Sequence, residues 1–227
     1  EQIKLQASPA ELNLALSLAA DKDCLKLTER LLKDGASLAS RDRFGASPLA
    51  RAARAGNIEI LDLFLAHGAA VNARNLDGST ALFMAAENDK SRIVTDLVEH
   101  GADINIPGRS GLSPLAAAAY MGSFSTVEVL LSKGASPNVE DSTGKTPICY
   151  SAARGYANVT GALLDHSVDV NARYGNQLTA LMWAAGHDDG AGSSNVADVL
   201  TLLIRRGADV NLADNRGRTA LMIAASI

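Results

Sequence analysis

Aromatic residues, cysteines and long apolar runs are all scarce in this sequence. Aromatic residues make up 4% of the 227 positions, and the hydrophobic fraction of 47% consists mostly of Ala and Leu. Small apolar side chains suit closely apposed helices better than a thick sandwich of sheets. The longest uncharged stretch, 110–127, contains Pro, Gly and several Ser, so it lacks the roughly 20 predominantly apolar residues of a spanning helix. The sequence therefore predicts a soluble protein without membrane insertion.

Charge and cysteine content narrow the choice of partners and compartments. The formal net charge of −4 argues against a nucleic-acid partner, because such partners usually meet a clearly basic face. Cys24 and Cys149 are predicted to be small core residues and are expected to lie too far apart for a disulfide. No signal peptide is visible in the sequence. Because the chain begins at Glu1 and not at Met, we expect either a periplasmic protein whose signal peptide was removed or a cytoplasmic protein that was trimmed.

One period runs through most of the chain. Glycines, asparagines and Ser or Thr residues each recur every 33 residues in a fixed phase, at Gly45, Gly78, Gly111 and Gly144, at Asn72, Asn105, Asn138 and Asn171, and at Ser47, Thr80, Ser113, Thr146 and Thr179. A shared period indicates stacked structural repeats, and this period is the length of the ankyrin repeat.

The motifs within each period add to a resemblance to ankyrin-repeat proteins. The family's T-P-L-H and G-A-D-V-N motifs are matched at Ser47–Leu49, Ser113–Leu115, Thr146–Ile148, Gly101–Asn105 and Gly207–Asn211. The chain resembles an ankyrin-repeat protein over residues 9–227, and the segment Leu181–His187 is similar to bacterial members. The resemblance implies an all-α solenoid of stacked helix-turn-helix units joined by β-hairpin-like turns.

Each recurring position has a physical role. Ser or Thr can cap the first helix by accepting a hydrogen bond from a free N–H, and the Pro that follows needs no donor there. Paired alanines let neighbouring helices approach closely. Asp-x-x-Gly segments, as at 42–45 and 141–144, are predicted to form the hairpin turns. The second helices are predicted to end in the left-handed conformation at Gly68, Gly101, Gly134 and Gly207.

The period predicts a single ankyrin-repeat domain over residues 1–227. The first unit begins with a predicted capping box at Ser8–Glu11, and a unit with seven extra residues within 186–195 comes near the end. The units are 9–41, an N-terminal cap, then 42–74, 75–107, 108–140, 141–173, the longer 174–213 and the partial 214–227. The partial unit is expected to expose an apolar flank, so either the chain continues past Ile227 or something covers that end.

Three features depart from the repeat. Ser167 stands where Gly is usual, at a cost of about 1 kcal/mol if the left-handed conformation is kept. The segment 174–177 replaces a hairpin motif. Apolar residues such as Phe83 and Cys149 replace the His of the family motif, and the fold is expected to survive this change.

The candidate chemical sites are few, and each has a simpler structural explanation. Gly144-Lys145-Thr146 matches only the end of a phosphate-binding loop, whose first Gly would have to stand at Val139. The cluster His187–Gly190 could bind calcium, but it lacks EF-hand spacing. One repeat position holds His67, His100 and His166. A titratable group there, near a helix C-terminus, interacts favourably with the helix dipole. We therefore predict no catalytic residue, no cofactor site and no metal site.

The resemblance implies a concave binding face built from hairpin tips and first helices. The exposed place just before the paired alanines is assigned to Arg51, Met84, Ala117, Tyr150, Trp183 and Ile223, and the places after the alanines include Arg54 and Ala153. Trp, Tyr and Arg dominate binding hot spots. The predicted protein-binding residues are Phe44, Arg51, Arg54, Met84, Glu87, Arg109, Tyr120, Met121, Tyr150, Arg154, Trp183 and His187. The alternative is that Tyr150 and Trp183 merely pack on each other.

These expectations favour a protein-interaction scaffold or adaptor. Its partner would be another protein, and neither enzyme activity nor a small-molecule substrate is expected. Two alternatives stay open. The chain could be an accessory or inhibitory subunit of an enzyme complex, which co-purification with a larger assembly would reveal. It could also bind a small ligand or a metal, which would need a deep pocket with converging polar groups.

Overall fold

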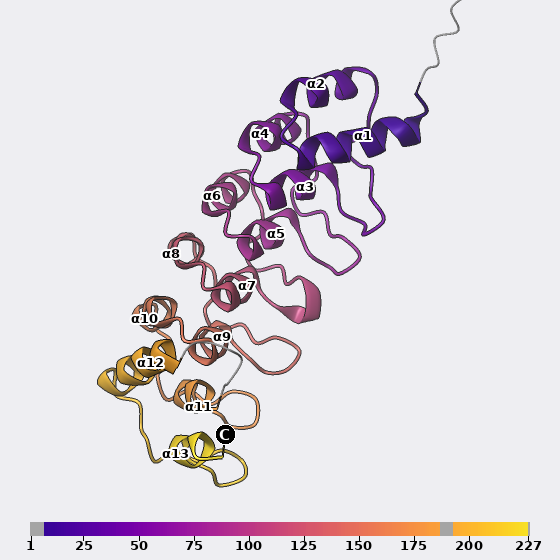
Figure 1. Cartoon of the computed structure of the whole chain (residues 1–227). Coiled ribbons are helices and arrows are strands. Elements are labelled where there is room, and N and C mark those ends of the chain that lie inside the picture. The colour runs from indigo at the N-terminus through magenta and orange to yellow at the C-terminus, as the bar shows by residue number, and fades with distance from the viewer. Residues whose placement is uncertain (1–6, 187–192, 227) are drawn as a thin grey trace, which may run out of the picture. The chain divides into compact units, whose positions relative to one another are not determined.

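The chain folds into short helices joined by turns (Figure 1). The computed structural model describes residues 7–186 and 193–226. Within these ranges it has thirteen α-helices and one short 3-10 helix. Extended pairing in the same ranges is limited to the isolated bridges Tyr174–Leu178 and Ala213–Thr219. The predicted all-helical fold class is confirmed.

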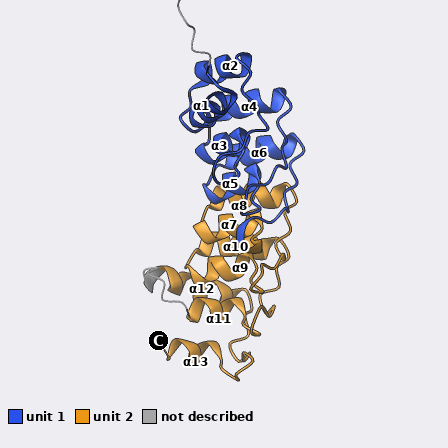
Figure 2. Ribbon diagram, turned by 90° about the vertical axis from the view of Figure 1, so that its right-hand side faces the viewer, with its two compact units in different colours: residues 1–109 blue, residues 110–227 orange. Residues whose placement is uncertain are grey.

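The helices form two compact units, Glu1–Arg109 and Ser110–Ile227, called unit 1 and unit 2 below (Figure 2). The helix pairs of unit 1 are α1 (Pro9–Asp21) with α2 (Leu25–Lys33), α3 (Pro48–Ala55) with α4 (Ile58–Ala66), and α5 (Ala81–Glu87) with α6 (Ser91–Glu99). The first helices pack in series, α1 on α3 and α3 on α5, and α2 packs on α4. Each pair corresponds to one sequence period.

Unit 2 repeats this arrangement. Its pairs are α7 (Pro114–Met121) with α8 (Phe124–Ser132), α9 (Pro147–Ala153) with α10 (Ala157–Asp165), and α11 (Ala180–Ala185) with α12 (Ser193–Arg205), followed by α13 (Ala220–Ala224). Helix α9 packs on α7 and α11, α11 packs on α13, and α10 packs on α8 and α12. A short 3-10 helix, η1 (Arg109–Gly111), lies where the sequence passes from unit 1 to unit 2. The single domain over 1–227 stays a prediction.

The first helices begin, as predicted, at a Ser or Thr cap. A hydroxyl oxygen accepts a hydrogen bond of 3.1–3.4 Å from the N–H three residues on at Ser47, Thr80, Ser113, Thr179 and Thr219. Ser8 and Glu11 form the predicted capping box. Thr146 differs, because its hydroxyl lies 3.5 Å from the Cys149 sulfur and caps no N–H.

The second helices end in a left-handed residue. The φ angles are +77°, +84°, +89° and +91° at Gly68, Gly101, Gly134 and Gly207. Ser167, at the equivalent place, has φ +65°. A residue with a Cβ is strained there, by about 1–2 kcal/mol, because the Cβ approaches a carbonyl oxygen. The predicted strain at Ser167 is therefore present.

Alanines make up the contact between neighbouring first helices. The exposed fraction is 0% at Ala52, Ala53, Ala85, Ala86, Ala118 and Ala119. Cys149 is buried in the core, as predicted, whereas Cys24 is exposed and the prediction for it is wrong. Cys24 stands at the N-cap of α2, at the end of the helix rather than on its packed face. Both thiols are free.

The asparagine period joins successive repeats. In unit 1 the Asn72 side chain donates to the Gly101 carbonyl at 3.3 Å and accepts from the Asp103 N–H at 2.9 Å. In unit 2 the Asn171 side chain makes the same pair of hydrogen bonds, at 3.1 and 2.8 Å, to Gly207 and Asp209. The position needs a donor and an acceptor at once, which an amide supplies and a carboxylate does not.

The last helix exposes the apolar flank expected of a partial unit. Leu221 and Met222 of α13 are 79% and 57% exposed, whereas the equivalent Leu181 and Met182 are 3% and 2% exposed. The same two side chains are covered in α11 because a further first helix, α13, packs there.

Ser167→Gly should raise the free energy of unfolding by about 1 kcal/mol, because glycine tolerates the left-handed conformation. Urea unfolding followed by circular dichroism measures the change. The reciprocal variant Gly134→Ser is the control. A Cβ at Gly134 meets nothing within 4 Å, so only the backbone cost applies and stability should fall. No gain from Ser167→Gly would contradict the strain.

Asn171→Ala should lower the free energy of unfolding by about 2 kcal/mol, since two hydrogen bonds between repeats are lost. Asn176→Ala, in the same unit and on an exposed side chain, should leave it almost unchanged. Thermal unfolding of both variants gives the comparison. Equal stability of the two would show that the asparagine period does not join the repeats energetically.

Candidate functional site

Four hairpin turns are closed by a side-chain oxygen. The oxygen accepts hydrogen bonds of 2.7–3.1 Å from the N–H groups two and four residues on, at Asp42, Asn75, Asp141 and Asp214. A turn fixed by its own side chain holds the residues at its tip in a defined direction. The hairpin tips are therefore rigid supports for side chains that a partner could contact.

The turn carboxylates are held in the charged state. Burial opposes the charge of Asp42, but the turn N–H groups and the Arg51 guanidinium outweigh burial and hold the pKa below its ordinary 3.8. Burial also opposes the charge of Asp141, and there the Tyr150 hydroxyl and the turn N–H groups lower the pKa. The N–H groups of its own turn lower the pKa of Asp214.

Aromatic and cationic side chains meet on unit 2. This aromatic–cation patch consists of Tyr120, Tyr150, Trp183, Lys145 and Arg154. The rings of Tyr120 and Tyr150 meet edge to face, with centroids 5.7 Å apart and planes at 83°. The Arg154 guanidinium lies 4.5 Å from the Tyr120 centroid. The Lys145 ammonium lies 5.1 Å from the Trp183 centroid and 5.5 Å from the Tyr150 centroid.

Tyr150 fastens the patch to its hairpin. Its hydroxyl donates to the Asp141 carboxylate, the same group that closes the turn. Burial and, after it, this hydrogen bond raise the pKa of Tyr150 well above its ordinary 10, so the ring stays neutral. The orientation of the Tyr150 ring is thus set by its hydrogen bond to the turn as well as by its contact with the Tyr120 ring.

Trp183 contributes an unsatisfied donor to the patch. Its indole N–H is buried and has no hydrogen-bond partner among the described residues. A buried donor without an acceptor costs about 1–3 kcal/mol.

The predicted arginines of unit 1 are engaged within their own unit. They form the ion pairs Arg51–Asp42, Arg54–Asp21 and Arg109–Glu87. A carboxylate already beside a guanidinium compensates much of its charge, so a second carboxylate is attracted less strongly. The paired arginines are therefore weaker anchors for a partner than the sequence suggested.

A family model of three ankyrin repeats matches the chain over residues 16–108, 51–141 and 115–200. The chain belongs to the ankyrin-repeat family. Ankyrin repeats are generally protein–protein interaction modules, and proteins of this family are typically non-enzymatic binding scaffolds. No curated protein matches the chain. None of the helices in the described ranges combines the length and the apolar character needed to cross a bilayer.

The ankyrin register puts some predicted contact positions inside the protein. Tyr120 and Met121 are exposed, at 40% and 50%. Ala117, Ala153 and Ile223 were expected to be exposed but are 3%, 6% and 7% exposed. The alanine side chains are too short to emerge between larger neighbours. Ile223 packs against Gly186, because a Cβ placed on Gly186 would lie only 2.7 Å from the Cγ2 atom of Ile223. His187 lies outside the described residues.

Sequence analysis missed two residues, one in each unit, that belong with the predicted contact residues of that unit. Leu18 precedes Arg51 by 33 residues, so it holds the same repeat position, and it is 55% exposed. The period would have identified it, had it been extended into the irregular first unit. No sequence pattern pointed to Lys145, because the two rings that its ammonium contacts, Tyr150 and Trp183, belong to different repeats.

The repeated histidines close helix ends. Their Nδ1 atoms lie 2.8, 2.7 and 2.9 Å from the carbonyl oxygen four residues earlier, at His67, His100 and His166. This geometry matches a ring N–H that satisfies a free carbonyl of the last turn. In the described part of the chain, no group of three or more His, Cys, Asp or Glu residues is arranged to hold a metal. The segment 187–190, the calcium candidate, is not in that part.

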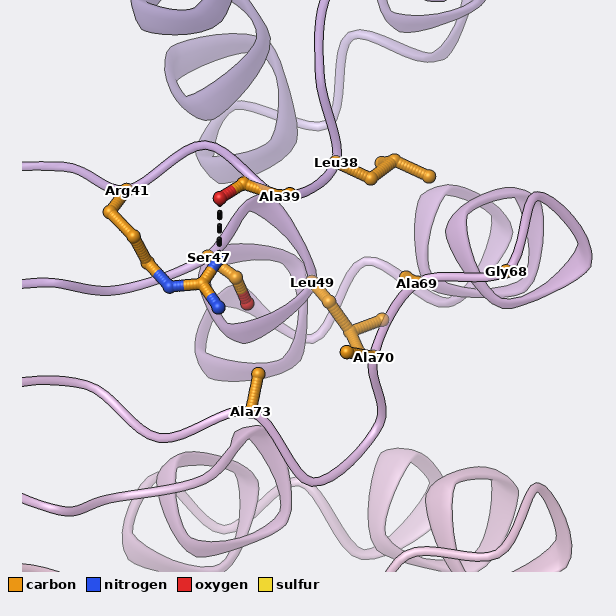
Figure 3. Close-up of a pocket in the computed structure, with 9 residues that line it drawn as sticks. All are labelled: Leu38, Ala39, Arg41, Ser47, Leu49, Gly68, Ala69, Ala70 and Ala73. Atoms are coloured by element: carbon orange, nitrogen blue, oxygen red, sulfur yellow. Dashed lines mark hydrogen bonds between the residues drawn. The ribbon is translucent and has the colours of Figure 1, made fainter.

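A small pocket of unit 1 is too narrow for an ordinary ligand (Figure 3). Its volume is about 130 Å³, and alanines and leucines make up most of its wall. Small-molecule sites usually measure about 300–1,000 Å³. Its guanidinium, that of Arg41, already donates to the Ala39 carbonyl at 2.9 Å. This pocket gives no support to the small-ligand alternative.

Acid should destabilise the fold through the turn carboxylates. Their pKa values are lowered in the folded state, so their stabilising contribution is complete above the unfolded value near 3.8 and is lost as the pH falls through the lower folded value. The melting temperature should be steady above about pH 5 and fall below about pH 4.

Asp141→Asn tests this cause. The amide keeps the acceptor, as Asn75 does in its own turn, but does not titrate. The variant should be less stable than the parent at pH 7 and should lose less stability between pH 5 and pH 2. Calorimetric melting curves across that range supply the measurement. An acid-induced loss as large as the parent's would refute the assignment to Asp141.

Proposed function

We propose that this chain is a protein-interaction scaffold, and that a partner protein binds over the aromatic–cation patch of unit 2. One observation supports this proposal most. Three rings of the first helices, those of Tyr120, Tyr150 and Trp183, each lie under a cation, which is Arg154 or Lys145. Tyr, Trp and Arg are the residue types most enriched in binding hot spots. An ankyrin-repeat chain that contains few aromatic residues has gathered three of them there.

The patch is suited to binding because it is held in place before a partner arrives. Tyr150 is fixed by Asp141, and the rings and cations support each other. Ordering a free side chain on binding costs about 0.5–1.5 kcal/mol, and side chains already ordered avoid that cost. Tyr120 of the patch and its chain neighbour Met121 are exposed and offer apolar surface that a partner can cover.

The proposal includes no catalytic role. The Cys149 thiol is a nucleophile type near the patch, but burial raises its pKa to about 11, so it stays protonated. Tyr150, whose pKa is also raised, cannot serve as a base at neutral pH. The residues of the patch present ring faces and cations to a partner.

Replacing Tyr120, Tyr150 and Trp183 together with Ala should abolish partner binding, because the ring faces are lost. The full chain is used as bait in a lysate of its source organism, and captured proteins are quantified by mass spectrometry. At least one protein should be captured by the parent and depleted more than about tenfold with the triple variant. Far-UV circular dichroism should show the helices intact.

A matched triple variant controls for the loss of apolar surface. Phe124, Ile204 and Val210 are also in unit 2 and are 41%, 52% and 48% exposed. Replacing these three with Ala should leave capture unchanged. Equal capture by the parent and both triple variants would remove the patch from consideration as the binding site.

A further inference from the structure

A larger hollow in unit 1 lies between α1 and the first hairpin. It encloses about 670 Å³. Its lining includes Leu14 and Leu18 of α1, Arg41, Asp42 and Arg43 of the hairpin, and Arg51 of α3. The hollow is open to solvent along these side chains and lies on a different unit from the aromatic–cation patch. Its size is that of a site for a peptide segment or a ligand of similar bulk.

One wall of the hollow is apolar and exposed. Leu14 and Leu18 are 60% and 55% exposed and, four residues apart, lie on one face of α1. Helix α1 has 13 residues, whereas α3 and α5 have 8 and 7. The added turns are what bring Leu14 onto this face. Two neighbouring leucines left in water on the binding side of a repeat mark a surface that gains from being covered.

The opposite wall is cationic and only partly neutralised. Arg41 donates to the backbone carbonyls of Ala39 and Ser40, at 2.9 and 3.0 Å. Arg43 lies over the Phe44 ring, 4.7 Å from its centroid. Within the described ranges, no carboxylate forms an ion pair with either guanidinium. Backbone carbonyls and a ring face do not neutralise these guanidinium groups, so both keep a positive charge at the rim.

The acids near the hollow are already committed. Asp42 accepts from its own turn and pairs with Arg51. Asp21 pairs with Arg54 at 2.5 Å. Glu11, on α1, is bound to Ser8 in the capping box. Glu11 keeps its charge but does not line the hollow, whereas Arg41 and Arg43 line it without a carboxylate partner among the described residues, so the lining favours an acidic ligand although the whole chain has a net charge of −4.

We propose that this hollow binds an acidic segment of a partner protein, in which one or two large apolar side chains cover Leu14 and Leu18 while carboxylates pair with Arg41 and Arg43. The proposal rests on the proposed function, since it takes the chain to bind protein segments. It concerns unit 1 alone and adds the chemistry of the partner. Ser40 also lines the hollow, and its hydroxyl is buried and has no hydrogen-bond partner among the described residues.

A protein segment fits the hollow better than a nucleic acid does. A phosphate backbone would use the two arginines but would leave the leucines uncovered, and nucleic-acid sites usually have a broad basic surface. An acidic segment with apolar residues uses both walls. Charge pairing at the rim should make binding weaken as salt is added, because exposed charges are screened within about 10 Å at 0.1 M.

The test is selection of peptides from a random displayed library on the full chain. Peptides rich in Asp or Glu beside Leu, Ile or Phe should be enriched. Arg43→Glu and Leu18→Ser should each weaken binding of the selected peptides by about tenfold. The affinities are measured by fluorescence anisotropy with labelled synthetic peptides. Matched controls on α2, Lys26→Glu and the exposed Leu27→Ser, make the same changes outside the hollow and should have no effect.

The outcomes separate this proposal from the proposed function. If peptides are selected but are indifferent to Arg43→Glu and Leu18→Ser, and are lost with the Tyr120, Tyr150 and Trp183 triple variant, the hollow is refuted and the scaffold function stands. If no peptide is selected, the proposal for the hollow fails, and the proposed function is decided separately by the capture experiment with the Tyr120, Tyr150 and Trp183 triple variant. Two further results would overturn the proposal, because each shows a different occupant of the hollow. One is a labelled single-stranded DNA that binds more tightly than the selected peptides. The other is a dimer, detected by sedimentation, that dissociates when Arg43→Glu is introduced.

Discussion

The contact between first helices of neighbouring repeats is the constraint on which each unit depends. These helices are too short to be stable alone in water, because isolated helices below about 12–15 residues are marginal. They persist because each buries its paired alanines against the next, at 0% exposure for Ala52 and Ala85. Alanine permits an approach that a larger side chain would prevent. The exposed Leu221 and Met222 show what a helix of this kind looks like when no further helix covers it.

Stacking of this kind leaves the hairpins and the outer side of the first helices free to vary. The side-chain oxygen that closes each turn keeps the hairpin rigid, and the Asn72 and Asn171 amides join one repeat to the next. Rigid hairpins can then hold contact residues without a core of their own. Asp141 does both tasks, because it closes its turn and orients Tyr150. The turn and the proposed contact surface are therefore coupled through a single side chain.

The two units present different contact chemistry. In unit 1 the arginines Arg51, Arg54 and Arg109 are paired with local acids, and the exposed leucines of α1 line a hollow together with Arg41 and Arg43, which are not paired with an acid among the described residues. In unit 2 cations lie on aromatic rings. From their positions in the repeat alone, the arginines and aromatic residues of both units were predicted to be equivalent contact residues. Whether an arginine is available to a partner depends on which acid lies within reach, and that acid usually belongs to another repeat or to the turn.

The sequence by itself determined the period, the helix caps, the left-handed helix ends and the strain at Ser167, because each of these depends on local chemistry within a few residues. Only the tertiary structure decided which contact residues are accessible. It buried Ala117 and Ile223, exposed Cys24 and Leu18, and set Lys145 over rings from two repeats. These properties depend on distances between side chains that the stack brings together, and a repeated motif specifies the stack without specifying those side chains.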